Sequence, residues 1–255
     1  MIVEFIGCTG AGKTMLISKV RNRLAEIAEV TTSYELVAAP LGLQGIRHSS
    51  ARNIIQEIVG LPFFIRSLFK NIAFIGFNLR ILARQTKLPF FTFNNLRSLE
   101  RKVGVYELIK RNGHGKIILV DEGTVLQAHH LFVFNDWLYT SEELARFSCL
   151  LPMPDMIIYV RAPLNDLIQR SLQRADPPRI MRNKNQTQNE IFLRRANAMF
   201  EELIETEQIK NRVLIVDNPD SMKHKYENLV QYIVESILNF KLSTNGKYSS
   251  FYVCK

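Results

Sequence analysis

An eight-residue segment near the amino terminus constrains the fold more than any other feature. Gly7-Cys8-Thr9-Gly10-Ala11-Gly12-Lys13-Thr14 matches the pattern G-x-x-x-x-G-K-[ST], and the apolar run Ile2 to Ile6 directly precedes it. Apolar residues at spacings of three and four follow it: Leu16, Val20, Leu24 and Ile27. A strand, a glycine-rich turn and a helix in this order are typical of a phosphate-binding loop, the Walker A motif. Both the backbone N–H groups of the turn and the start of the helix attract a phosphate.

The residue types in this loop indicate separate tasks. The three glycines permit positive φ, which lets the backbone curl around the anion. We expect Lys13 to place its ammonium beside the β and γ phosphates, and Thr14 to ligate Mg²⁺ through its hydroxyl. The residues expected to hold ATP are Gly7, Cys8, Thr9, Gly10, Ala11, Gly12, Lys13 and Thr14. The glycine spacing does not match the G-x-G-x-x-G of dinucleotide-binding loops.

A pair of carboxylates follows a second apolar run. Ile117 to Val120 leads directly into Asp121 and Glu122. Because a phosphate loop needs a carboxylate at a neighbouring strand end to hold Mg²⁺ and its waters, we expect Asp121 to belong to the metal shell. Glu122 leaves two catalytic roles open, since it would orient an attacking water in an ATPase and hold the acceptor in a kinase. A solvated strand end is the ordinary alternative for both.

Strand-like and helical patterns alternate along the chain. Strands are expected at 2–6, 30–38, 117–120, 156–160 and 213–216. Helices are expected near 163–174, 192–203 and 226–240, and two or three more within 47–111, with breaks at Gly60, Pro62 and Pro89. This alternation predicts an α/β fold, a doubly wound parallel sheet joined by right-handed crossovers.

Length and composition favour one folded unit. A chain of 255 residues with 47% apolar and 22% charged residues has the material for a full core, which excludes wholesale disorder. We expect a single domain over 1–242 and a loosely ordered tail over 243–255. No charge-free apolar run reaches the length of a spanning helix, and three Cys cannot all pair. A cytoplasmic location is therefore expected.

Positive charge gathers in one segment. Residues 41–115 hold 12 Lys and Arg against three Glu, which equals the net charge of +9 of the whole chain. Half of the 16 Phe lie in the same segment. Three interpretations stay open for the helical part, 41–112: an acceptor-binding region, an amphipathic surface that contacts an anionic membrane or polymer, or helices with an aromatic core and a solvated basic face. No recognised nucleic-acid-binding module is present.

The order of these motifs resembles the thymidylate kinase-like group of P-loop nucleoside and nucleotide kinases, over most of the chain. The matching segments are Gly7–Thr14, Asp121–Gly123, Ile157–Pro163, 176–189, Phe192–Leu203 and Val213–Asp217. The resemblance implies a P-loop fold of the nucleotide kinase type, with Arg170 and Arg174 on a helix facing the phosphates. It also implies a lid over 175–189, in which Arg179 and Arg182 would close on the transferring phosphoryl group.

The sequence departs from that group at two motifs. Ala38-Ala-Pro40 stands where thymidylate kinases carry Arg-Glu-Pro, and Asp121-Glu-Gly123 stands where they carry Asp-Arg-Tyr or a close variant. A thymidylate acceptor is therefore not supported. Glu35 lies where deoxynucleoside kinases place a catalytic carboxylate, although glutamates are also common at strand ends.

Together these features predict an enzyme that transfers the γ-phosphoryl group of ATP, with Mg²⁺, to a small anionic or hydroxyl-bearing acceptor, above all a nucleoside or nucleotide. The expected catalytic residues are Lys13, Asp121, Glu122, Arg174 and Arg179, and Arg170 is expected to help bind the nucleotide. Two alternatives stay open: an NTPase in which Glu122 directs water, and a nucleotide-gated protein that binds a membrane or polyanion. A homodimer is compatible with all three.

Overall fold

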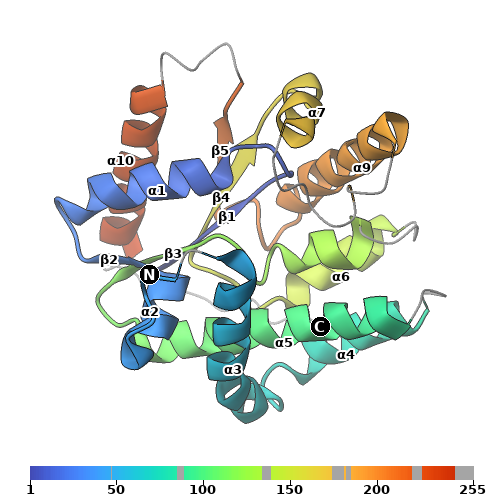
Figure 1. The fold of residues 1–255 in the computed structure, drawn as a ribbon, viewed down its shortest axis with the longest axis horizontal. Helices are drawn as coiled ribbons and strands as arrows, with labels where there is room; N and C mark the ends of the chain where they lie inside the picture. The colour runs from blue at the N-terminus through green and yellow to red at the C-terminus, as the bar shows by residue number, and fades with distance from the viewer. Residues whose placement is uncertain are drawn as a thin grey trace.

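The computed structural model describes residues 1–46, 48–84, 89–133, 139–173, 181, 185–219 and 226–244 (Figure 1). Its strands are β1 (Ile2–Ile6), β2 (Val30–Thr32), β3 (Ile117–Val120), β4 (Met156–Arg161) and β5 (Val213–Asp217). The first helices are α1 (Lys13–Ala25), α2 (Ser33–Ala38), α3 (Ser49–Ser67), α4 (Ile72–Ala83) and α5 (Pro89–Asn112). The later ones are α6 (Ser141–Leu150), α7 (Leu164–Leu172), α9 (Gln186–Ile204) and α10 (Tyr226–Thr244). A 3-10 turn covers Ala39–Leu41, and a π-helical turn covers His129–Val133.

The five strands form one parallel sheet in the order β2-β3-β1-β4-β5. β1 lies at its centre, where Val3 pairs with Leu119 of β3 on one side and with Met156 of β4 on the other. The doubly wound α/β fold with a parallel sheet is therefore confirmed. Because all strands run the same way, the ends of β1, β3 and β4 meet at one edge, and that edge carries the loops.

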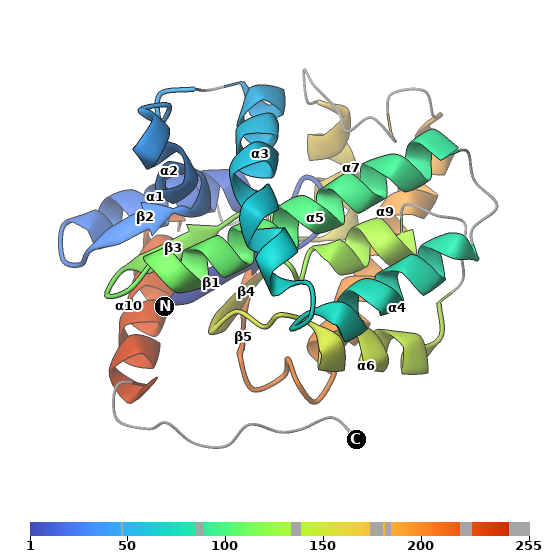
Figure 2. The same ribbon diagram turned by 90° about the horizontal axis from the view of Figure 1, so that it is seen from below.

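Helices cover both faces of the sheet (Figures 1 and 2). On one face α1 packs beside α10, and Leu16 and Val20 of α1 reach the same core cluster as Val3 and Phe5. On the other face Ile2 and Ile118 pack against Val105 and Ile109 of α5. Burial on both faces explains why the inner strands β1, β3 and β4 are mainly apolar, without regular polar alternation.

The second strand is shorter than the sequence predicts. Only Val30–Thr32 is extended, and residues 33–38, expected to continue the strand, form α2. Local capping decides the change: Thr32 accepts a hydrogen bond from the Glu35 N–H, and the Glu35 carboxylate accepts one from the Thr32 N–H. This capping box satisfies N–H groups that a continued strand would leave at the sheet edge.

Three helices between 49 and 112 agree with the expectation, but two of the expected breaks, at Gly60 and Pro62, are wrong. α3 runs through Gly60 and Pro62 and ends at Ser67. Gly60 serves packing instead, because a Cβ added at Gly104 of α5 would lie 2.4 Å from the Gly60 carbonyl oxygen. The two glycines let α3 cross α5 closely (Figure 2). Residues 243 and 244, expected to begin the tail, are the last residues of α10.

Candidate active site

The loop between β1 and α1 has the backbone of an anion cradle. Gly7, Gly10 and Gly12 have φ of 137°, 85° and 92°. Gly12 is also required by its neighbour, because a Cβ there would lie 2.5 Å from the side-chain nitrogen of Asn218. The first turn of α1 contains no acidic residue, so the positive end of the helix is not offset by a carboxylate of its own.

Lys13 opens α1 and reaches back over the loop. Its Nζ donates hydrogen bonds to the carbonyl oxygens of Gly7, at 2.7 Å, and Cys8, at 2.9 Å. These contacts hold a positive charge at the mouth of the cradle, which suits the phosphates of a nucleotide. Cys8 takes no part as a nucleophile, because burial raises the pKa of its thiol to about 12.

Thr14 and Asp121 come together across the edge of the sheet. The Thr14 Oγ1 donates a hydrogen bond to the Asp121 Oδ2 at 3.1 Å, although the two residues are 107 positions apart. Burial raises the pKa of Asp121, and the charge of Lys13 opposes that rise. A hydroxyl and a carboxylate are hard oxygen ligands of the kind that Mg²⁺ prefers, so these two residues fit the ion that a phosphate loop uses.

Asn218, which sequence reasoning missed, supports the loop from the end of β5. Its side-chain nitrogen donates to the Ala11 carbonyl oxygen at 2.8 Å, and its backbone N–H donates to the Arg161 carbonyl oxygen at 2.8 Å. The side chain is buried against Gly12. The only sequence signal was its position after the last strand, which many solvated asparagines share.

Arg170 lies on α7, as the resemblance implies, where it forms an ion pair with Asp166 at 3.9 Å and also contacts backbone. Its guanidinium donates to the carbonyl oxygens of Gly10, at 3.2 Å, and Asn218, at 2.9 Å. It therefore ties the phosphate loop to the segment after β5. Whether it also binds nucleotide stays a prediction. Arg174, Arg179, Arg182 and most of the expected lid lie outside the described residues.

Two further arginines, both missed, stand near the carboxylates. Arg101 of α5 forms an ion pair with Glu122 at 3.0 Å. Arg52 of α3 lies 4.3 Å from the ring centroid of Tyr34, and its charge, like that of Lys13, opposes the rise that burial causes in the pKa of Asp121. An aromatic ring and two guanidinium groups therefore lie on the side of Asp121 that faces α2, α3 and α5. Sequence reasoning placed both arginines only within a general basic segment.

Glu35 has a structural position. Its carboxylate accepts the capping hydrogen bond from Thr32 and forms an ion pair with Arg21 at 2.6 Å. These partners lower its pKa against the opposing effect of burial. A carboxylate held in this way is a poor proton acceptor.

A buried carboxylate lies directly beneath the Asp121 turn. Glu4, in the centre of β1, accepts hydrogen bonds from the N–H groups of Val125, at 3.2 Å, and Leu126, at 2.9 Å. Burial raises its pKa to about 7. The side chain of Lys102, also buried, has its pKa lowered to about 7 by burial and donates to Gln127 at 3.0 Å. Glu4 thus fixes the backbone that follows Asp121 and Glu122.

Comparison with known proteins gives limited similarity. No protein-family model and no curated protein sequence matches the chain. Among solved structures, deoxyadenosine kinase from M. mycoides with bound dCTP is similar at 13% identity and a TM-score of 0.49, covering 94% of this chain and 100% of that one. The same enzyme with the products dCMP and a flexible dCDP is similar at 16% identity and a TM-score of 0.49, covering 96% and 100%. Similarity at this level carries no information about the reaction, so the chemistry rests on the site itself.

Proposed function

We propose that this protein is a phosphotransferase that moves the γ-phosphoryl group of ATP, with Mg²⁺, to a small acceptor, a nucleoside or nucleotide. The observation that carries the proposal is the contact of Thr14 with Asp121 at 3.1 Å beside a cradle that Lys13 closes. Bound Mg²⁺ would supply charge neutralisation at the β and γ phosphates. The finer assignment, to the thymidylate kinase-like group, rests on the sequence resemblance alone.

In this mechanism the residues of the chain position and neutralise charge. The N–H groups of residues 7–14 and the ammonium of Lys13 hold the phosphates. Thr14 and Asp121 would hold Mg²⁺. Arg174 and Arg179, by the resemblance, would stabilise charge on the transferring group as it develops.

The surroundings of Glu122 favour an acceptor over water. Its ion pair with Arg101 fixes the carboxylate on the side of Asp121 where Arg52 and Tyr34 also lie. The guanidinium groups of Arg52 and Arg101 suit a phosphate or a base edge. A water-directing glutamate would need its carboxylate turned to the γ-phosphate instead.

The proposal is tested by ADP release from Mg·ATP with the whole chain, with no acceptor and with panels of nucleosides and nucleoside monophosphates. We expect release that depends on an acceptor and on Mg²⁺. Asp121→Asn should lose the Mg²⁺-dependent rate, while Glu29→Gln, a change at an exposed carboxylate that pairs with Lys116, should not.

Other results of these assays would favour a different function or remove Asp121 from the site. Release that needs no acceptor would contradict the phosphotransferase and support the NTPase alternative. Nucleotide binding without any turnover would support a nucleotide-gated binding protein. An Asp121→Asn variant with normal metal dependence would remove Asp121 from the site.

A further inference from the structure

The bend between α3 and α4 exposes an unusual amount of apolar surface. Ile58, Leu61 and Ile65 recur at spacings of three and four on the outer side of α3, and the bend continues them. Phe69 is 89% exposed and Ile72 is 63% exposed. We call these six residues the elbow surface: Ile58, Leu61, Ile65, Leu68, Phe69 and Ile72. A soluble surface rarely gathers so many large apolar side chains in one stripe, so a partner is implied.

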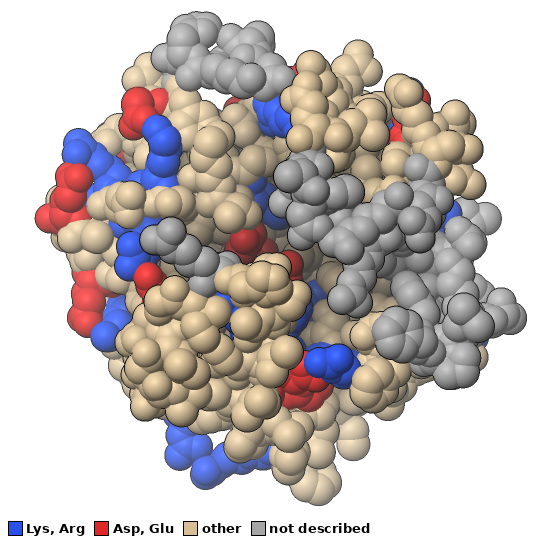
Figure 3. All heavy atoms as spheres, in the orientation of Figure 1, with Lys and Arg blue, Asp and Glu red and all other residues tan. Residues whose placement is uncertain are grey.

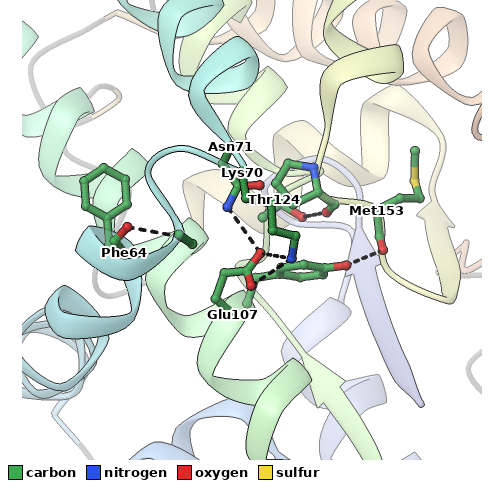
Figure 4. Close-up of polar contacts among 9 residues, drawn as sticks. Phe64, Lys70, Asn71, Glu107, Thr124 and Met153 are labelled. Carbon is green, nitrogen blue, oxygen red and sulfur yellow. Dashed lines mark hydrogen bonds and ion pairs between the residues drawn. The ribbon is translucent and has the colours of Figure 1, made fainter. Parts of the chain in front are cut away.

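The elbow is held in a fixed shape (Figure 4). Lys70 and Asn71 both donate to the carboxylate of Glu107 on α5, at 2.8 Å and 3.2 Å. The neighbouring Tyr106 donates to the Met153 carbonyl oxygen at 2.7 Å, which ties that part of α5 to the rest of the molecule. Because these inner contacts anchor the bend, the apolar side chains on its outer side stay exposed.

Charge around the elbow is positive. Arg66 and Arg80 are exposed, and neither forms an ion pair with another described residue. From residue 41 to residue 99 the only acidic residue is Glu57, which pairs with Arg97. Figure 3 shows a broad area of uncharged atoms over α2 and α3, with Lys and Arg atoms at its lower edge.

We propose that the elbow surface docks on an anionic lipid bilayer, with Phe69 and Ile72 in the headgroup region and Arg66 and Arg80 at the phosphates. Charge complementarity selects this occupant. A second copy in a symmetric contact would bring the same uncompensated arginines together, whereas anionic headgroups neutralise them. A protruding apolar bend with flanking cations also fits a fluid interface.

The mode of contact is peripheral. Among the described helices no single one is long and apolar enough to cross a membrane. α3 and α4 satisfy that length and composition only together, as a pair bent by 113°. Since Phe64 and Phe74, on the inner sides of the two helices, pack against the hydrophobic core, the pair is fixed to the protein and only its outer side is available.

The test is co-sedimentation of the full chain with phosphatidylcholine vesicles, with and without phosphatidylglycerol, at low and high salt. We expect binding only to the anionic vesicles, weakened by salt. Ile65→Ser/Phe69→Ser/Ile72→Ser should lower the partition coefficient by more than about tenfold, because apolar area is lost. Arg66→Gln/Arg80→Gln should lower it about fivefold for each charge removed.

Matched controls separate the elbow from general surface effects. Ile27→Ser/Leu242→Ser removes exposed apolar side chains elsewhere, and Arg23→Gln/Lys116→Gln removes an exposed and a partly exposed cation elsewhere. Both should bind like the wild type. If the triple variant unfolds, the single variant Phe69→Ser, at the most exposed position, replaces it in the test. Thermal melting establishes that each variant is folded.

Three results would overturn the proposal. One is a wild type that does not bind anionic vesicles. Another is a folded elbow variant that binds as well as the wild type. The third is a wild-type dimer by light scattering that the elbow variants dissociate, without vesicle binding, since a second copy would then cover the surface.

Discussion

Asn218 shows how a single side chain shapes the glycine-rich loop from outside the motif. Its amide fills the space that a Cβ on Gly12 would need, and it donates to the Ala11 carbonyl oxygen at 2.8 Å. Together with Arg170 it connects the phosphate loop to the end of β5. The loop is therefore preorganised by residues that do not belong to G-x-x-x-x-G-K-[ST], and preorganisation of this kind supports affinity.

Asn218→Ala should weaken binding of a non-hydrolysable ATP analogue by about fivefold, because one hydrogen bond that shapes the loop is lost. Calorimetric titration in the presence of Mg²⁺ measures the change. Asn228→Ala, at an exposed asparagine on α10, is the control and should leave the affinity unchanged. Equal affinity in the two variants would show that Asn218 does not shape the site.

Glu4 should give the protein a characteristic dependence of stability on pH. Because burial raises its pKa to about 7, the folded protein keeps a proton that the unfolded chain releases near its ordinary pKa of 4.5. Its contribution to stability is thus complete below that ordinary pKa and declines as the pH rises to about 7, by on the order of 3 kcal/mol in total.

The measurement is urea unfolding of the wild type and Glu4→Gln from about pH 5 to about pH 7. The wild type should lose free energy of unfolding relative to the variant as the pH rises. Burial lowers the pKa of Lys102 to about 7, so Lys102 makes the free energy of unfolding rise with pH above about 7. Lys102 is present in both the wild type and Glu4→Gln. A difference that does not vary with pH would show that Glu4 is already ionised in the folded protein.

At the scale of elements, α3 and α5 depend on a close crossing. The Gly60 and Gly104 backbones touch there, which explains why a helix tolerates Gly60 in its interior. The crossing supports the proposed acceptor site and the proposed membrane contact. The reason is that α3 carries Arg52 on the acceptor side and residues of the elbow surface towards its end. Sequence rules treat Gly and Pro as breakers, and such tertiary contacts override them.

Gly104→Ala should destabilise the protein by about 1 to 3 kcal/mol, because its Cβ would meet the Gly60 carbonyl and force the helices apart. Gly76→Ala on α4 is the matched control, since a Cβ there meets nothing within 4 Å. It should raise stability by up to about 1 kcal/mol through helix propensity. Thermal melting distinguishes the two, and equal effects would contradict the close crossing.

The lid arginines give a kinetic prediction. Arg174→Ala and Arg179→Ala should lower kcat by about ten- to a thousandfold and alter nucleotide affinity less, because charge on the phosphoryl group develops only in the transition state. Steady-state kinetics with the acceptor found in the screen measures both. Unchanged kcat in both variants would place these arginines on the solvated surface.

For the whole molecule, strong local patterns made the sheet predictable. The apolar runs at β1, β3 and β4 suit a sheet covered on both faces, and the loop follows from the spacing of its glycines and Lys13. The length of β2 was overestimated, because the reciprocal hydrogen bonds of a capping box start α2 directly after Thr32. At the candidate site, spacing predicts Lys13, Thr14 and Asp121, and the structure brings Thr14 and Asp121 into contact beside the loop that Lys13 covers. Arg52, Arg101 and Asn218 could not be predicted, because only the tertiary fold brings them to the carboxylates and the loop.

We propose that Gly7–Thr14 and Asp121 bind Mg·nucleotide, and calorimetric titration with a non-hydrolysable ATP analogue is the decisive test. The wild type should bind in the presence of Mg²⁺, and Lys13→Ala should bind about ten- to a hundredfold more weakly, because a charged hydrogen-bond donor to the phosphates is lost. Lys19→Ala, on the outer side of the same helix and paired with Glu227, should bind like the wild type. Unchanged affinity in the Lys13→Ala variant, or no binding by the wild type, would contradict the account.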